Sequence, residues 1–216
     1  MHPKNLALLV TLLPILACNG VYLLSAAGAH VSWCVPYLEG CTSISRAARL
    51  GPGLWWFKLL MIAYGILMIG LWQYAQRWLD SLREQQTRTG RLNLALGVSG
   101  SLALIVYIIF LGSDGAMYNF MRRAGVLVYF FCIPLAQLLL LNQHYKLTHE
   151  RAGFARHLTA LRFQTTVLIL LLLIAIASLI SEALQIKTQA SENVVEWNFS
   201  LLMTLYFAAL GTIWKK

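Results

Sequence analysis

Six long apolar runs constrain this chain more than any other feature of its sequence. Each reaches the ~20 residues that a helix needs to cross a bilayer, and they lie at 6–26, 54–76, 92–112, 124–143, 164–184 and 195–214. The runs are continuous and rich in leucine, as in TTVLILLLLIAIASLI, whereas strands of a membrane barrel alternate apolar and polar residues. The sequence therefore predicts an all-α fold: a polytopic bundle of six transmembrane helices, forming a single domain over residues 1–216.

Composition supports a membrane protein over a soluble one. The chain is 59% hydrophobic and 12% charged, and 216 residues cannot bury that much apolar surface in a soluble core. The first run, followed by Ala27-Gly28-Ala29, also resembles a signal peptide with its cleavage site. Because the apolar part of a signal peptide typically has only about 7–15 residues, we expect the first run to be a retained helix.

The net charge of +9 suits either a nucleic-acid-binding protein or a membrane protein, so the positions of the charges decide. If the N-terminus is cytoplasmic, three acidic residues share that side with eleven basic ones: Lys4, Arg77, Arg83, Arg88, Arg91, Lys146, Arg151, Arg156, Arg162, Lys215 and Lys216. The other side holds six basic and five acidic residues. Because Lys and Arg collect in cytoplasmic loops, we expect both termini to be cytoplasmic and no nucleic-acid partner.

This topology puts the polar loop of residues 27–53 outside the cytoplasm. The loop carries Cys34 and Cys41, and oxidising compartments favour disulfides. Paired cysteines also bind zinc, but the nearest outer histidine is His30 and no second cysteine pair follows. We therefore favour a Cys34–Cys41 disulfide and expect no metal site and no cofactor.

Within the loop, TSISRAARL predicts a short helix capped by Thr42 or Ser43. Arg46 and Arg49, at i and i+3, share one face and have the guanidinium groups that bind phosphate. In the alternative interpretation the helix only covers the bundle, and its arginines pair with Glu39 or reach into water.

Three ionisable residues are predicted near the outer membrane surface, at the level of this loop. They are Lys58, Glu182 and Glu196, and such residues at membrane depth tend to be functional. Lys58 paired with Glu182 or Glu196 would form an outward-facing pocket. Together with Arg46 and Arg49 these three are the predicted lipid-binding residues, and membrane lipids are the expected partners.

Two other functions stay open at this point. Ser43 or Ser45 with His30 could form a site for lipid acyl transfer or hydrolysis, although the sequence has no G-x-S-x-G elbow. A scaffold subunit would bind another membrane protein, through a small-residue face such as Gly97 and Gly100–Ser101. The histidines at 144, 149 and 157 do not follow i, i+4 ligand spacing, so we expect a solvated interfacial face there.

Several segments together resemble a known family. They are C-V-P at 34–36, S-I-S-R at 43–46, R-L-N at 91–93 and V-E-W-N at 195–198. With six helices, they resemble the DRAM/Sfk/FGF-receptor-activating-protein family, which includes the PGAP-type GPI-anchor remodelling factors and the N-terminal half of Cwh-type proteins. The resemblance spans nearly the whole chain.

This resemblance implies a lipid-related role, in GPI lipid remodelling, lipid asymmetry, autophagy or lysosomes, without an agreed catalytic nucleophile. The short loops and compact chain resemble a bacterial member, so we expect the bacterial inner membrane rather than a eukaryotic endomembrane or plasma membrane. A bacterial member would act on a lipid other than a GPI anchor. The expected function is binding of a phospholipid or glycolipid head group in an outer-leaflet pocket under the 34–53 loop.

Overall fold

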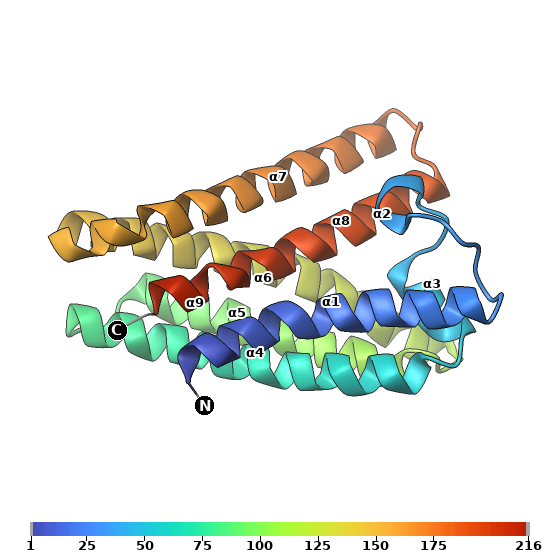
Figure 1. Cartoon of the computed structure of the whole chain (residues 1–216), viewed down its shortest axis with the longest axis horizontal. Coiled ribbons are helices and arrows are strands. Elements are labelled where there is room, and N and C mark those ends of the chain that lie inside the picture. The colour runs from blue at the N-terminus through green and yellow to red at the C-terminus, as the bar shows by residue number, and fades with distance from the viewer. Residues whose placement is uncertain (1, 215–216) are drawn as a thin grey trace.

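The computed structural model describes residues 2–214, and over that range the protein is built from helices (Figure 1). The long helices are α1 (Pro3–Ala27), α4 (Leu54–Arg83), α5 (Arg88–Phe110), α6 (Ala116–Glu150), α7 (Leu158–Ala183) and α8 (Gln189–Ala208). The short ones are α2 (Pro36–Glu39), α3 (Ile44–Leu50), the 3-10 helix η1 (Ala152–His157) and α9 (Leu210–Ile213).

Within residues 2–214, six helical segments are long and apolar enough to cross a membrane. This confirms the predicted all-α, six-helix class. The predicted runs mark the apolar parts of the helices rather than their ends: α6, for example, has 35 residues because it continues through polar sequence on both sides. The sixth span is interrupted at Ala209, between α8 and α9.

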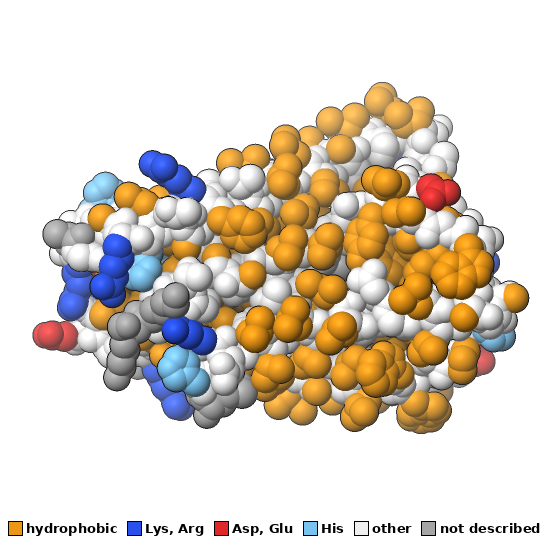
Figure 2. Space-filling model, viewed as in Figure 1, with side chains coloured by type: hydrophobic (Ala, Val, Ile, Leu, Met, Phe, Trp, Pro, Cys, Tyr) orange, Lys and Arg blue, Asp and Glu red, His pale blue; other side chains and the backbone are white. Residues whose placement is uncertain are grey.

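The bundle has two chemically different ends. The loop end carries the connections 28–53, 111–115 and 184–188, and the basic end carries 84–87 and 151–157. Both described chain ends lie at the basic end, where Lys and Arg side chains gather, while apolar side chains cover the flank (Figures 1 and 2). Lys215 and Lys216, which entered the charge count, lie outside the described residues. The assignment of the basic end to the cytoplasm stays a prediction.

The core contains buried aliphatic and aromatic residues from every long helix, and α1 and α4 contribute many of them. Trp72 and Phe207 pack edge to face at 5.8 Å between ring centroids. Gly97 lies directly against the Trp72 ring, and Gly100 lies against Ile133 of α6. The small-residue face of α5 is therefore covered within the chain, and the expectation that it is free for a partner is wrong.

Candidate functional site

Side chains of α8 fasten the polar loop onto the end of the bundle. Three of them donate to loop carbonyls: Asn193 to Gly40 (2.8 Å), Trp197 to Thr42 (2.8 Å) and Asn198 to Tyr37 (2.7 Å). A fourth, the carboxylate of Glu196, accepts a hydrogen bond from the backbone N–H of Ser45 at 3.4 Å. Because buried backbone groups need partners, the segment NVVEWN fixes both the position and the conformation of the loop.

The loop is also tied to itself and to α1. Cys34 and Cys41 form the predicted disulfide, with Cα atoms 6.4 Å apart. The hydroxyl of Tyr22 on α1 donates to the carbonyl of Cys34 and accepts from its N–H, both at 2.8 Å. Gly40 follows α2 with φ +62°, and a Cβ there would overlap the backbone of Ala190. Only glycine both adopts this positive φ without strain and leaves the space that Ala190 occupies free.

The predicted short helix in the loop is confirmed. The hydroxyl of Ser43 caps α3 by accepting a hydrogen bond from the N–H of Arg46 at 3.1 Å. Ile44, Ala47 and Ala48 form its buried face, as their spacing predicts. Arg46 and Arg49 lie on the exposed face.

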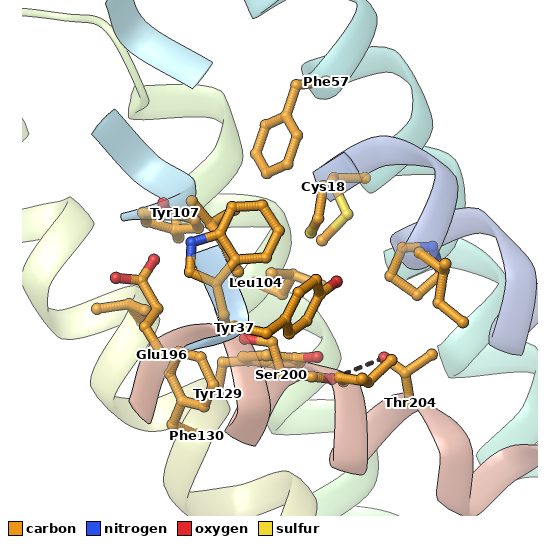
Figure 3. Close-up of a pocket in the computed structure, with 17 residues that line it drawn as sticks. Cys18, Tyr37, Phe57, Leu104, Tyr107, Tyr129, Phe130, Glu196, Ser200 and Thr204 are labelled. Atoms are coloured by element: carbon orange, nitrogen blue, oxygen red, sulfur yellow. Dashed lines mark hydrogen bonds between the residues drawn. The ribbon is translucent and has the colours of Figure 1, made fainter. Parts of the chain in front are cut away.

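A cavity of about 60 Å³ lies beneath this loop. Its lining residues come from α1, α4, α5, α6 and α8, together with Ile44 of α3 and Tyr37 of α2. Figure 3 shows side chains that line it. Most lining groups are apolar, among them Phe57, Leu104 and Phe130. Since one water needs roughly 10–15 Å³ by this measure, the cavity has room for several waters or a short apolar group.

The cavity has polar groups on two sides. Glu196 and Tyr107 lie near each other on one side, while Thr204 donates to the carbonyl of Ser200 at 2.9 Å on the other side (Figure 3). Glu196 is half-buried, and its hydrogen bond with Ser45 anchors the loop. This arrangement gives the carboxylate of Glu196 a structural role at the boundary between loop and cavity.

Next to the cavity is an open groove of about 420 Å³ lined by arginines. Arg49 comes from α3, and Arg122 and Arg123 come from α6. Among the residues that line the groove there is no carboxylate within the described range. Tyr107 and Val126 line both the groove and the cavity, so a polar, cationic space and an apolar space share one wall.

The three arginines of the groove are held differently. Arg122 is half-buried and donates to the carbonyls of Phe110 and Ser113 and to the side chain of Asn119, which fixes the connection between α5 and α6. Arg49 uses its Nε to bond its own helix, at the carbonyl of Ser45 (3.3 Å). Arg49 and Arg123 are exposed, so their guanidinium groups are the ones best placed to meet an anion.

Sequence reasoning missed Arg122 and Arg123 as site residues, although it counted their charge. A signal was present, because they are adjacent cations on the predicted outer side, which has fewer basic residues than the predicted inner side. Their meeting with Arg49 could not be inferred, since it depends on how α3 packs against α1, α4 and α8 at the end of the bundle.

The other predicted lipid-binding residues do not come together. Arg46 is exposed and is not part of the groove. Lys58 donates to the carbonyl of Ile109 at 3.1 Å and lies over the ring of Trp55 at 5.2 Å. Glu182 pairs with Lys187 at 2.9 Å. Among the ion pairs of residues 2–214, none joins Lys58 to Glu182 or Glu196, so that prediction is wrong.

The residues of the enzymatic alternative do not form a catalytic pair either. The hydroxyl of Ser43 caps α3 and lies 3.3 Å from that of Ser45. His30 is exposed after the end of α1. Within the described range, no side-chain hydrogen bond joins His30 to either serine. The geometry therefore offers no activated nucleophile at these positions.

The predicted solvated face of histidines is wrong for His144. Its side chain is fully buried, and its ring packs against Trp78 at 5.9 Å and Phe154 at 6.1 Å, because α6 turns this side towards α4 and η1. In the part of the chain that the structure describes, no group of three or more His, Cys, Asp or Glu side chains is arranged to hold a metal ion. Cys18 and Cys132 are buried free thiols.

The fold and the apolar surface define the class of this molecule as an integral, multi-pass membrane protein. Comparisons with protein-family models, curated proteins and solved structures gave no match to this chain. The resemblance to the DRAM/Sfk family stays a prediction from the quoted residues.

Proposed function

We propose that this protein binds a membrane lipid with an anionic head group at its loop end. The head-group phosphate lies in the arginine groove, and an apolar part of the lipid reaches the cavity under the 34–53 loop. The observation that carries the proposal is the shared wall of Tyr107 and Val126 between a cationic groove and an apolar cavity. A phospholipid or an anionic glycolipid has these two chemistries side by side in the same order.

Charge and geometry support a phosphate over a neutral head group. Guanidinium groups bind phosphate through paired, charge-assisted hydrogen bonds, and Arg49 and Arg123 present exposed guanidinium groups to the groove. The apolar flank of the bundle supports access from the lipid phase, since exposed leucines and isoleucines cover it.

The proposal also includes the leaflet in which the groove lies and the membrane that contains the protein. The excess of Lys and Arg at the basic end supports a cytoplasmic position for that end, which puts the groove in the outer leaflet. The short connections support a bacterial inner membrane, and the lipid-related roles of the DRAM/Sfk family agree with binding of a lipid other than a GPI anchor.

Lipid retention tests this function. Protein extracted in mild detergent is analysed by native mass spectrometry after incubation with phosphatidylglycerol. We expect Arg49→Gln with Arg123→Gln to lower retention at least about tenfold, because two charge-assisted hydrogen bonds are lost. The matched control, Arg46→Gln with Lys58→Gln, removes the same charge at the same end. If the control lowers retention and the groove variant does not, the head group does not bind in the groove.

A further inference from the structure

A second cationic groove lies at the opposite, basic end of the bundle. It has a volume of about 350 Å³ and is formed where α4 ends, α5 begins and α6 ends. Its charged lining groups are Arg83, Lys146, Arg151 and Glu150. The groove is therefore positive overall, and it shares no lining residue with the arginine groove at the loop end.

Three of the four charged side chains are engaged in contacts within the protein, and the fourth is not. Arg83 pairs with Glu150 at 3.3 Å and donates to the side-chain and backbone oxygens of Gln143 (3.3 and 2.9 Å), so its charge is largely used within the protein. Arg151 donates to the carbonyl of Leu82. Lys146 is exposed, and no hydrogen bond or ion pair within residues 2–214 engages its amine.

A buried donor in the wall has no partner in the described part of the chain. Gln143 lines the groove and is 1% exposed. Its Oε1 accepts from Arg83, which orients the amide, and its Nε2 is left without a hydrogen-bond partner. Buried donors are nearly always hydrogen-bonded, and a buried donor without a partner is destabilising. Among the residues that line the groove, Gln143 alone has a buried side-chain atom without a partner in the described range.

The first turn of α5 borders the same space. Thr87 caps α5 by accepting from the N–H of Gly90 at 3.0 Å, and both Thr87 and Thr89 line the groove. The first N–H groups of a helix point outward without intrahelical partners and attract anions. The helix start and Lys146 thus offer donors to one space, and the buried amide of Gln143 lies in its wall.

We propose that this groove binds a phosphate group. The phosphate accepts hydrogen bonds from Lys146 and the first turn of α5, beside the wall that contains the Gln143 amide, while Glu150 stays paired with Arg83. The group can belong to a soluble phosphate compound or to the head group of a lipid in the leaflet at the basic end. The two sources present the same chemistry to the groove, so the experiment has one arm for each.

The test uses the full chain carrying Arg49→Gln and Arg123→Gln, so that the loop-end groove does not contribute. One arm titrates inorganic phosphate by calorimetry in nanodiscs of phosphatidylcholine. The other measures enrichment of phosphatidic acid over phosphatidylcholine around the protein. We expect Lys146→Gln to weaken binding about tenfold in at least one arm, because a charge-assisted hydrogen bond is lost. Lys146 is exposed, so its replacement leaves the fold intact.

Arg77→Gln is the control, since Arg77 is exposed at the same end but does not line the groove. Phosphate binding that responds to Lys146→Gln and not to Arg77→Gln supports a soluble ligand, and lipid enrichment with the same response supports a head group. Equal effects of the two substitutions, or no binding in either arm, overturn the proposal. Neither outcome bears on the loop-end groove, which is already disabled.

Discussion

Replacing Trp197 by phenylalanine tests whether α8 holds the polar loop in place. The substitution keeps an aromatic ring against Tyr22 and Tyr37, whose centroids lie 6.0 and 5.1 Å from that of Trp197. It removes the indole N–H that donates to the carbonyl of Thr42 at 2.8 Å. Because Thr42 is fully buried, its carbonyl is then left without that partner.

The lost hydrogen bond sets the minimum expected size, because the smaller ring also leaves a cavity at this buried site. An unsatisfied buried acceptor costs about 1–3 kcal/mol of the free energy of unfolding, which corresponds to about 2–12 °C in Tm for a chain of this length. The assay is thermal unfolding in detergent, combined with hydrogen exchange of the backbone amides. Exchange is expected to rise in residues 34–53, where the lost bond lies, and to change little in α5 and α6.

Trp33→Phe is the matched control. It is the same substitution in the same loop, but the Trp33 side chain is 66% exposed, so its effect should stay within about 0.5 kcal/mol. If Trp197→Phe and Trp33→Phe unfold at the same temperature, or if exchange in the loop is unchanged, the docking of the loop by α8 is refuted.

Three further predictions concern other parts of the molecule. Gly97→Ala should lower Tm, since overpacking costs about 1–3 kcal/mol and the new Cβ meets the rigid ring of Trp72; the control Gly70→Ala has open space around it, and an equal Tm for both would refute the close packing of α4 on α5. A thiol reagent should label two cysteines of the denatured protein before reduction and all four after it; labelling of four before reduction would exclude the disulfide. Hydrogen bonds to Glu182 and Glu192 raise the pKa of Lys187 above its ordinary value. These contacts therefore stabilise the fold fully at a pH below the ordinary pKa of lysine, and their contribution is lost as the pH rises through the raised pKa. The alkaline fall in Tm should therefore be smaller in Lys187→Met, and an unchanged pH profile would contradict this.

The sequence predicts the helices well because the apolar runs report directly on burial in lipid. It predicts their ends poorly for the same reason. Hydropathy marks the part of a helix inside the bilayer, whereas α6 begins before Arg122 and runs on to Glu150, because a helix continues in water as long as its backbone hydrogen bonds are made. The disulfide and α3 were predictable because both depend on residues close together in the chain.

The pairing of charged residues was not predictable because hydropathy gives the depth of a residue but not the direction it faces. Lys58, Glu182 and Glu196 were all expected near the outer surface. Lys58 bonds to α5 and Glu182 bonds to the connection before α8. Which helices are neighbours depends on side-chain packing around the bundle, and no spacing within one helix reports on that.

The sixth span begins with polar residues, and the structure shows what holds them. Asn193, Glu196, Trp197 and Asn198 are costly at membrane depth unless they have partners. The loop has the opposite need, because its carbonyls at Tyr37, Gly40 and Thr42 are held against the bundle away from water. Each segment supplies what the other lacks. The hydrogen bond from the N–H of Ser45 to Glu196 joins the S-I-S-R segment to the V-E-W-N segment across about 150 residues of chain. A substitution in one segment should be compensated only by a change in the other, which no short motif could have indicated.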